Sequence, residues 1–204
     1  MTDNVLLKKY AACMEEVKKR TEVVRAFLNG KCSTPYKQTT AESICLQIRK
    51  ILELIALASL VANKNAYSEI RSKFAKDWNA KNIISDIERF NPNFYPHPTS
   101  QIINPRTGKV EKVEDIKSGW LTKNEFIHIY ERTGGLLHAE NPFGAKKDFD
   151  NFIRIVPTWM DKIIKLLNHH HMQLVDDDLQ YWVVMNGKED GKVQVSLFQK
   201  IGNA

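Results

Sequence analysis

The amino-acid sequence predicts a mainly α-helical fold: a helical bundle with a small C-terminal antiparallel β hairpin or three-stranded sheet. Apolar residues recur at steps of three and four between Leu6 and Leu28, which is typical of a helix with one buried face. Residues 51–62 are apolar on nearly every side, as expected of a helix in the middle of a bundle. Toward the C-terminus the pattern becomes β-rich. We therefore expect a helical bundle over residues 1–170 and a β appendage over residues 171–204, packed on the bundle.

The first two helices are expected to pack side by side and antiparallel. The first covers residues 5–28 and ends at Asn29-Gly30, because both residues tolerate the left-handed conformation of a helix C-cap. A loop that contains Pro35 follows. Thr39 or Thr40 can then cap a second helix, which runs to about residue 63 and contains the apolar segment.

The next part of the chain is expected to change from helix to irregular structure. Two short helices are predicted over residues 66–78 and 80–90. Residues 91–98 contain three prolines and cannot be helical, because proline lacks an N–H donor and restricts the residue before it. Residues 102–110 are predicted to form a small hairpin or an open loop.

Helical patterns return in the second half of the chain. Thr122 and Glu125 have the spacing of a capping box, in which each side chain bonds the backbone N–H of the other residue. The helix that they open is expected to break at Gly134-Gly135. A long helix is then predicted over residues 146–170.

The β appendage is predicted from two segments rich in β-branched and aromatic residues, 179–185 and 192–198. Residues 186–191 between them have the composition of a hairpin turn, and residues 172–175 can add a third strand. A lone hairpin is marginally stable in water, so this sheet should lie on the bundle or on a partner chain.

Cysteine content and hydropathy restrict the class of protein. The 204 residues include three cysteines, at positions 13, 32 and 45, with no CxxC pair. This content excludes a disulfide scaffold and a thiolate zinc module. The N-terminus lacks the pattern of a signal peptide, and residues 51–62 are shorter than the ~20 apolar residues that span a bilayer. We expect a cytoplasmic protein without a membrane partner.

The charge of the chain favours an acidic partner such as nucleic acid. The net charge is +6, from 30 basic and 24 acidic residues. Basic residues of the first helix and of the start of the last long helix could follow an RNA phosphate backbone. The candidate RNA-binding residues are Lys18, Lys19, Arg25, Lys146 and Lys147. The alternative is an ordinary solvated surface, because acidic residues interrupt both groups.

Arg132 and His138, with five residues between them, are the candidate catalytic pair. A histidine can exchange a proton with the RNA 2′-hydroxyl or the leaving oxygen near neutral pH. An arginine can hold the phosphate with two hydrogen bonds and stabilise the charge that develops on it. The alternative is structural: Arg132 as a cation at a helix C-terminus and His138 as a partly buried, hydrogen-bonded residue.

A helical bundle with Arg132 and His138 near the start of its final long helix resembles the HEPN superfamily. Many members of that superfamily are dimeric, metal-independent ribonucleases of toxin–antitoxin, anti-phage or RNA-processing systems, and others are binding or scaffold modules. The resemblance implies an RNA-binding protein or endoribonuclease that acts as a homodimer in a toxin or defence role. The family often has Asn, Asp or His directly after the arginine, whereas this chain has Thr133. The alternative function is a non-catalytic interaction or scaffold protein that binds a protein partner.

We expect no cofactor and no metal site. His169, His170 and His171 are adjacent, so on a helix their side chains point about 100° apart and cannot converge on one metal ion. We expect them to be solvated at the end of the last helix. Glu125 and His128 have the spacing of a di-iron motif, but the chain has no second copy of it.

Overall fold

The chain folds as a mixture of helices and one large sheet. The computed structural model describes residues 2–64, 79–176 and 178–200. Helix covers 53% and strand 16% of this part, and the strands form a five-stranded antiparallel sheet. The expected fold class, a mainly α bundle with a small hairpin or three-stranded sheet, is therefore wrong. The error lies in the sheet, which takes in a second hairpin over residues 97–115, longer than the small hairpin or open loop expected at 102–110, and a strand that starts at residue 169 rather than 172.

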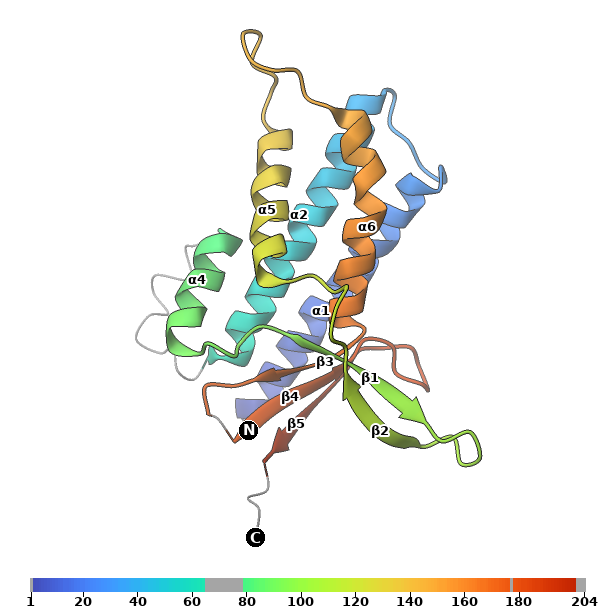
Figure 1. The fold of residues 1–204 in the computed structure, drawn as a ribbon, viewed down its shortest axis with the longest axis vertical. Helices are drawn as coiled ribbons and strands as arrows, with labels where there is room; N and C mark the ends of the chain where they lie inside the picture. The colour runs from blue at the N-terminus through green and yellow to red at the C-terminus, as the bar shows by residue number, and fades with distance from the viewer. Residues whose placement is uncertain (1, 65–78, 177, 201–204) are drawn as a thin grey trace.

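Most of the described helices lie above the sheet in Figure 1, and the first runs down beside it to the N-terminus. None of them is both long enough and apolar enough to cross a membrane. Predicted helices over residues 5–28, 39–63 and 80–90 are confirmed. The predicted cap of the second helix at Thr39 or Thr40 is wrong, because that helix already begins at Lys37, with Tyr36 as its N-cap residue. The prediction for residues 66–78 lies outside the described residues. The helices are α1 (Thr2–Leu28), α2 (Lys37–Ala62), α4 (Ala80–Phe90), α5 (Lys123–Leu137) and α6 (Phe149–Leu167).

Helix α2 lies at the centre of the bundle, as its apolar sequence predicts. It packs along α1 and also contacts α4, α5 and α6. Ile48, Ile51 and Leu52 are fully buried on this helix, and Ile55 is 1% exposed. Burial on several sides removes most of its apolar surface from water. Each Å² of apolar surface buried stabilises the folded state by about 25 cal/mol. The hydrophobic core of the protein is therefore built around α2.

The start of α5 follows its sequence signal, but its end does not. The Thr122 hydroxyl accepts from the Glu125 N–H, and the Glu125 carboxylate accepts from the Thr122 N–H, which confirms the capping box. The expected break at Gly134-Gly135 is wrong, because α5 continues through both glycines to Leu137. His138 is the C-cap residue of this helix.

The five strands of the sheet are ordered β2-β1-β3-β4-β5, and every neighbouring pair is antiparallel. The predicted C-terminal hairpin is confirmed as the β4–β5 pair. The first two strands form a second hairpin, which joins the sheet through the pairing of β1 with β3. The strands are β1 (His97–Ile103), β2 (Val110–Asp115), β3 (His169–Gln173), β4 (Leu179–Val184) and β5 (Gln194–Gln199).

The three adjacent histidines lie on β3 rather than at a helix end. Helix α6 stops at Leu167, so the expectation of solvated histidines on a helix is wrong. Side chains alternate between the two faces of a strand. His170 points into the core and is fully buried, whereas His169 and His171 lie on the other face of the sheet, beside Trp182.

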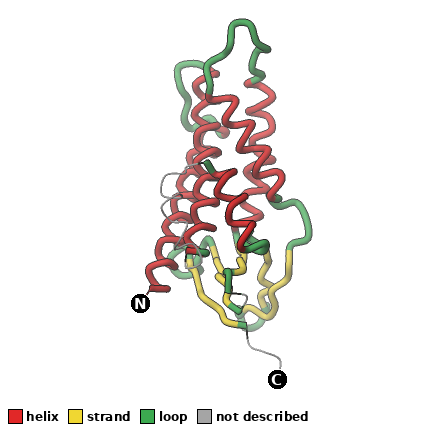
Figure 2. Tube along the Cα trace, turned by 90° about the vertical axis from the view of Figure 1, so that its left-hand side faces the viewer, coloured by secondary structure: helices red, strands yellow, loops and turns green. Residues whose placement is uncertain are grey.

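The sheet packs against the N-terminal half of α1. Figure 2 shows the strands gathered at one end of the molecule, next to this helix. The Tyr10 and Tyr181 rings form a T-shaped pair with their centroids 5.7 Å apart. The carboxylate of Glu15 accepts a hydrogen bond of 2.6 Å from the backbone N–H of Val193. The sheet and the helices therefore share one core.

Candidate functional site

Arg132 lies on α5 at the edge of a hollow between α5 and α6. The hollow has a volume of about 200 Å³ and is also lined by Lys147 and Phe152. The guanidinium carbon of Arg132 is 5.5 Å from the centre of the Trp159 ring, within the range of a cation–π interaction. Arg132 makes no ion pair with any residue that the structure describes. Its positive charge is therefore not held in an ion pair, and Asp148 also lines the hollow.

His138 lies in a second hollow on the other side of α5. This hollow has a volume of about 490 Å³ and is also lined by Arg49, Lys81 and Tyr130. His138 is exposed, and its ring has no hydrogen-bond partner among the described residues. The structural alternative of a partly buried, hydrogen-bonded histidine therefore does not describe its surroundings. The ring is free to contact a ligand.

The two candidate catalytic side chains do not share a hollow within one chain. Six residues of α-helix turn the chain by about 600°, so positions 132 and 138 lie about 120° apart around the axis of α5. Gly135 is midway between them and lines both hollows. The structure thus brings Arg132 and His138 to one helical segment, on either side of an exposed glycine.

The two glycines of α5 have different surroundings. A Cβ atom on Gly134 would lie 2.9 Å from a terminal nitrogen of Arg49, so this glycine allows Arg49 to approach the helix backbone. There Arg49 donates hydrogen bonds to the carbonyl and the hydroxyl of Tyr130, at 3.1 and 2.7 Å. A Cβ atom on Gly135 would meet nothing within 4 Å. No described packing contact accounts for Gly135.

Thr133, which follows the candidate arginine, is completely buried. Its hydroxyl donates to the backbone carbonyls of Ile129 and Tyr130, at 2.8 and 2.9 Å. A side chain that bonds its own helix in this way cannot reach a ligand on the surface. The polar position that often follows the arginine in the HEPN superfamily is therefore a core residue in this chain.

Two of the predicted RNA-binding lysines lie close to the C-terminal end of α5. The ammonium group of Lys147 donates to the backbone carbonyls of Leu136 and His138. A cation is favoured there, because the carbonyls at a helix C-terminus carry partial negative charge. Lys146 is exposed beside it. Lys147 therefore has a structural role, and it also adds positive charge to the hollow of Arg132.

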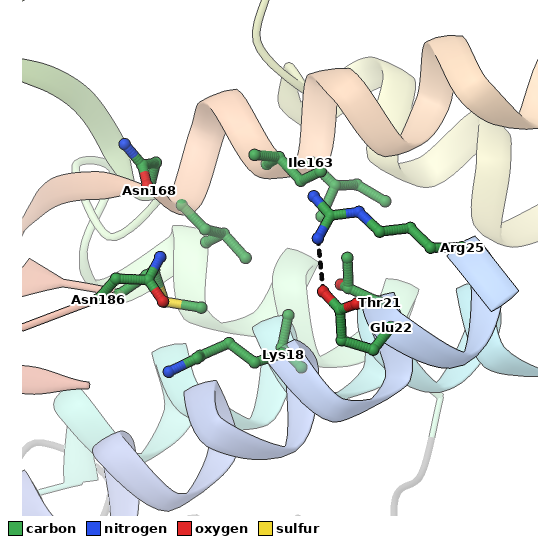
Figure 3. Close-up of a pocket in the computed structure, with 11 residues that line it drawn as sticks. Lys18, Thr21, Glu22, Arg25, Ile163, Asn168 and Asn186 are labelled. Carbon is green, nitrogen blue, oxygen red and sulfur yellow. Dashed lines mark hydrogen bonds and ion pairs between the residues drawn. The ribbon is translucent and has the colours of Figure 1, made fainter. Parts of the chain in front are cut away.

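The other predicted RNA-binding residues lie on α1, and two of them line a separate cavity. Figure 3 shows Lys18 and Arg25 at this cavity, which has a volume of about 160 Å³ between α1, α6 and the end of β4. Arg25 pairs with Glu22 at 2.5 Å, and Lys18 donates to the carbonyl of Gly191 at 2.6 Å. Lys18 also pairs with Glu15 at 3.3 Å, so both charges are partly neutralised within the chain, whereas Lys19 is exposed.

A cluster that the sequence did not indicate lies on the outer face of the sheet. His97 on β1, Asp115 at the end of β2 and His171 on β3 place one possible metal-ligating atom each within 4.8 Å of one another. They border a hollow of about 400 Å³. His97 and Asp115 are exposed, and His171 is half-buried. The three residues come from separate segments, so no local motif could have found them.

Comparison with known proteins does not assign the chain to a group. It matches no protein-family model, no curated protein and no solved structure.

Proposed function

We propose that this protein binds single-stranded RNA at the C-terminal half of α5 and cleaves it as a cytoplasmic, HEPN-like, metal-independent endoribonuclease in a toxin or defence role. The observation that carries the proposal is the placement of Arg132 and His138 on either side of the exposed Gly135. Each side chain lines its own hollow. Among the described residues, Arg132 has no ion pair and contacts Trp159 through its guanidinium, and the His138 ring has no hydrogen bond. An unpaired arginine and an exposed histidine on one helix can bind a phosphate and transfer a proton.

The surface around this segment supports the binding of phosphate groups. Arg132 and Lys147 face one hollow, and Arg49 and Lys81 face the other. Some of this charge is balanced, because Lys81 pairs with Glu131 and Arg49 with Glu53. Asp148 also lines the first hollow and Glu131 the second, so each hollow contains basic and acidic groups. Cations on both sides of α5 can contact neighbouring phosphates of one strand.

Gly135 supports the close approach of a ligand to the helix. Glycine inside a helix costs about 1 kcal/mol relative to alanine, because its unfolded backbone has more freedom to lose. No described neighbour would clash with a side chain at this position. A ligand that lies across α5 from one hollow to the other would clash with one. The exposed glycine is therefore explained by the proposed RNA path.

A homodimer would bring a catalytic arginine and histidine to one phosphate. Because Arg132 and His138 of one chain line different hollows, we propose that each active site combines Arg132 of one copy with His138 of the other. Mixing Arg132→Ala and His138→Ala proteins tests this arrangement. About a quarter of wild-type cleavage should return, since half of the dimers are mixed and one of their two sites is intact. A site within one chain would give no recovery.

The RNA surface itself can be tested with two variants at one position. Gly135→Glu and Gly135→Gln add side chains of similar size to open space, and only the first adds a negative charge. With 2′-O-methyl RNA, which cannot be cleaved through its 2′-oxygen, Gly135→Glu should bind about tenfold more weakly than Gly135→Gln. Equal affinities for the two variants would place the RNA elsewhere.

A non-catalytic role as a binding partner of another protein is the second candidate. Strand β5 is at one edge of the sheet, and its Phe198 side chain is 54% exposed. An edge strand with exposed apolar side chains can pair with a strand of another chain. Absence of RNA binding at low salt, together with capture of a partner that Phe198→Lys releases, would favour this function over the first.

A further inference from the structure

The antiparallel pairings of the sheet place two imidazoles and a carboxylate together. His97 is the register partner of His171 between β1 and β3, and Asp115 is the register partner of Thr99 between β1 and β2. The ring centroids of His97 and His171 are 5.1 Å apart, and Nε2 of His97 is 3.7 Å from a carboxylate oxygen of Asp115. We propose that His97, Asp115 and His171 bind a divalent transition metal ion, with Zn²⁺ the best match.

The spacing of these groups is close to that of ligands around one metal ion. Bonds of about 2.0–2.1 Å to tetrahedral Zn²⁺ place two ligand atoms about 3.3 Å apart. The 3.7 Å between His97 and Asp115 is near this value, and all three ligand atoms lie within 4.8 Å of one another. The side chains of His97 and Asp115 are 46% and 64% exposed, and a small rotation of the Asp115 side chain would close the difference.

Aromatic packing, rather than hydrogen bonding, holds the two imidazoles. The His171 ring is stacked on Trp182, with centroids 5.2 Å apart and planes inclined by 24°. The His97 ring meets Trp120 at 6.4 Å. Nδ1 of His171 is buried and has no hydrogen-bond partner in the described part of the chain. A buried polar atom without a partner destabilises the folded state. No hydrogen bond to this nitrogen fixes which ring nitrogen of His171 carries the proton.

The charge of the site also suits a cation. A metal ligand must be an unprotonated imidazole or a carboxylate. The Asp115 carboxylate supplies one negative charge. Two imidazoles with one carboxylate match the preference of Zn²⁺ and of the other late first-row metals.

The hollow beside the cluster leaves room for further ligands. Its volume is about 400 Å³, and Tyr95, Trp120 and Gln173 also line it. Three protein ligands and an open position are typical of metal sites that bind water or a small molecule. The loop that follows α5 lies at the opposite end of the molecule from the sheet (Figure 1). The metal site is therefore separate from the proposed RNA surface. A test of metal binding does not decide whether the protein binds RNA, and a test of RNA binding does not decide whether it binds metal.

Titration of metal-free protein with Zn²⁺ tests the site. Calorimetry should give one Zn²⁺ per chain, and His97→Gln or Asp115→Asn should weaken binding at least tenfold. Both positions are exposed, so the folded structure should be retained, as circular dichroism would verify. The control is His128→Gln, an exposed histidine on α5 that should leave Zn²⁺ affinity unchanged.

Magnetic resonance of the imidazoles locates the bound ion. Zn²⁺ should shift the ring signals of His97 and His171 and leave those of His128 and His138 in place. Co²⁺ should give visible absorption bands that disappear in the His97→Gln protein. The proposal is overturned if the wild type binds no Zn²⁺, or if His97→Gln and Asp115→Asn bind it as tightly as the wild type does.

Discussion

Nε2 of His170 lies 2.8 Å from the hydroxyl oxygen of Tyr10, deep between the sheet and α1. The other ring nitrogen, Nδ1, is 2.8 Å from the backbone carbonyl of Leu167, which can only accept a hydrogen bond. Nδ1 therefore carries the proton, and Nε2 accepts from the Tyr10 hydroxyl. A neutral imidazole satisfies both contacts, and they tie β3 to α1 across 160 positions of sequence.

The protein should lose stability as the pH falls from about 6.5 toward 4. Burial lowers the pKa of His170 to about 4, whereas an unfolded histidine has a pKa near 6.5. Between these values the unfolded chain binds a proton that the folded chain does not bind, so acid favours unfolding. The full effect is ~3 kcal/mol in the free energy of unfolding.

Urea unfolding at several pH values, with a chelator present, measures this effect. His170→Gln should be less stable than the wild type at pH 7.5 but should show a weaker loss toward pH 4.5. His169 and His171 also have pKa values lowered by burial, and they contribute equally to both proteins. The same pH dependence in both would show that His170 does not titrate as described.

Alanine substitutions at the two glycines of α5 should have different effects on stability. Gly135→Ala should raise the free energy of unfolding by about 1 kcal/mol, because the added methyl group meets no neighbour and the unfolded chain loses freedom. Gly134→Ala should gain less or lose, because its Cβ displaces the Arg49 guanidinium from Tyr130. Thermal unfolding checks both. Equal gains would mean that Arg49 moves away without cost.

Substitutions in the central helix should show how strongly the core depends on it. Ile55→Asp should prevent folding, since an unpaired buried charge costs several kcal/mol against a total stability of about 5–15 kcal/mol. Ile55→Ala should fold but lose about 2–5 kcal/mol. Leu54→Asp should be milder, because Leu54 is only partly buried. Circular dichroism and urea unfolding give these values, and an unchanged midpoint for Ile55→Asp would contradict the central position of α2.

The parts of the fold that were predictable are those whose signals are local. Residues close together in the sequence determine four features: the apolar stripe of α1, the apolar segment of α2, the Thr122 capping box and the β4–β5 hairpin. Strand β2 has no such signal, because four of its six residues are charged and its side chains are largely exposed. Its position comes from pairing with β1, which a sequence pattern does not show.

The errors at α5 and β3 have a similar cause. Two adjacent glycines disfavour a helix locally, but the Arg49 contacts with Tyr130 help to hold the backbone of α5 in place. The histidines after α6 look solvated because their sequence is polar, yet His169 and His170 bond to residues far along the chain. The metal cluster combines positions 97, 115 and 171, which only the folded sheet brings together. The spacing of Arg132 and His138 was visible in the sequence, whereas their separate hollows were not.

Cleavage of single-stranded RNA by the wild type and by His138→Ala, in the presence of a chelator, tests the central claim most directly. His128→Ala is the matched control, because His128 is an exposed histidine on the same helix. The wild type and His128→Ala should cleave RNA but not DNA and leave 2′,3′-cyclic phosphate ends, since the RNA 2′-hydroxyl is the attacking group. His138→Ala should still bind RNA but should not cleave it. Equal cleavage by wild type and His138→Ala, or no cleavage by either, would contradict the proposed catalytic function.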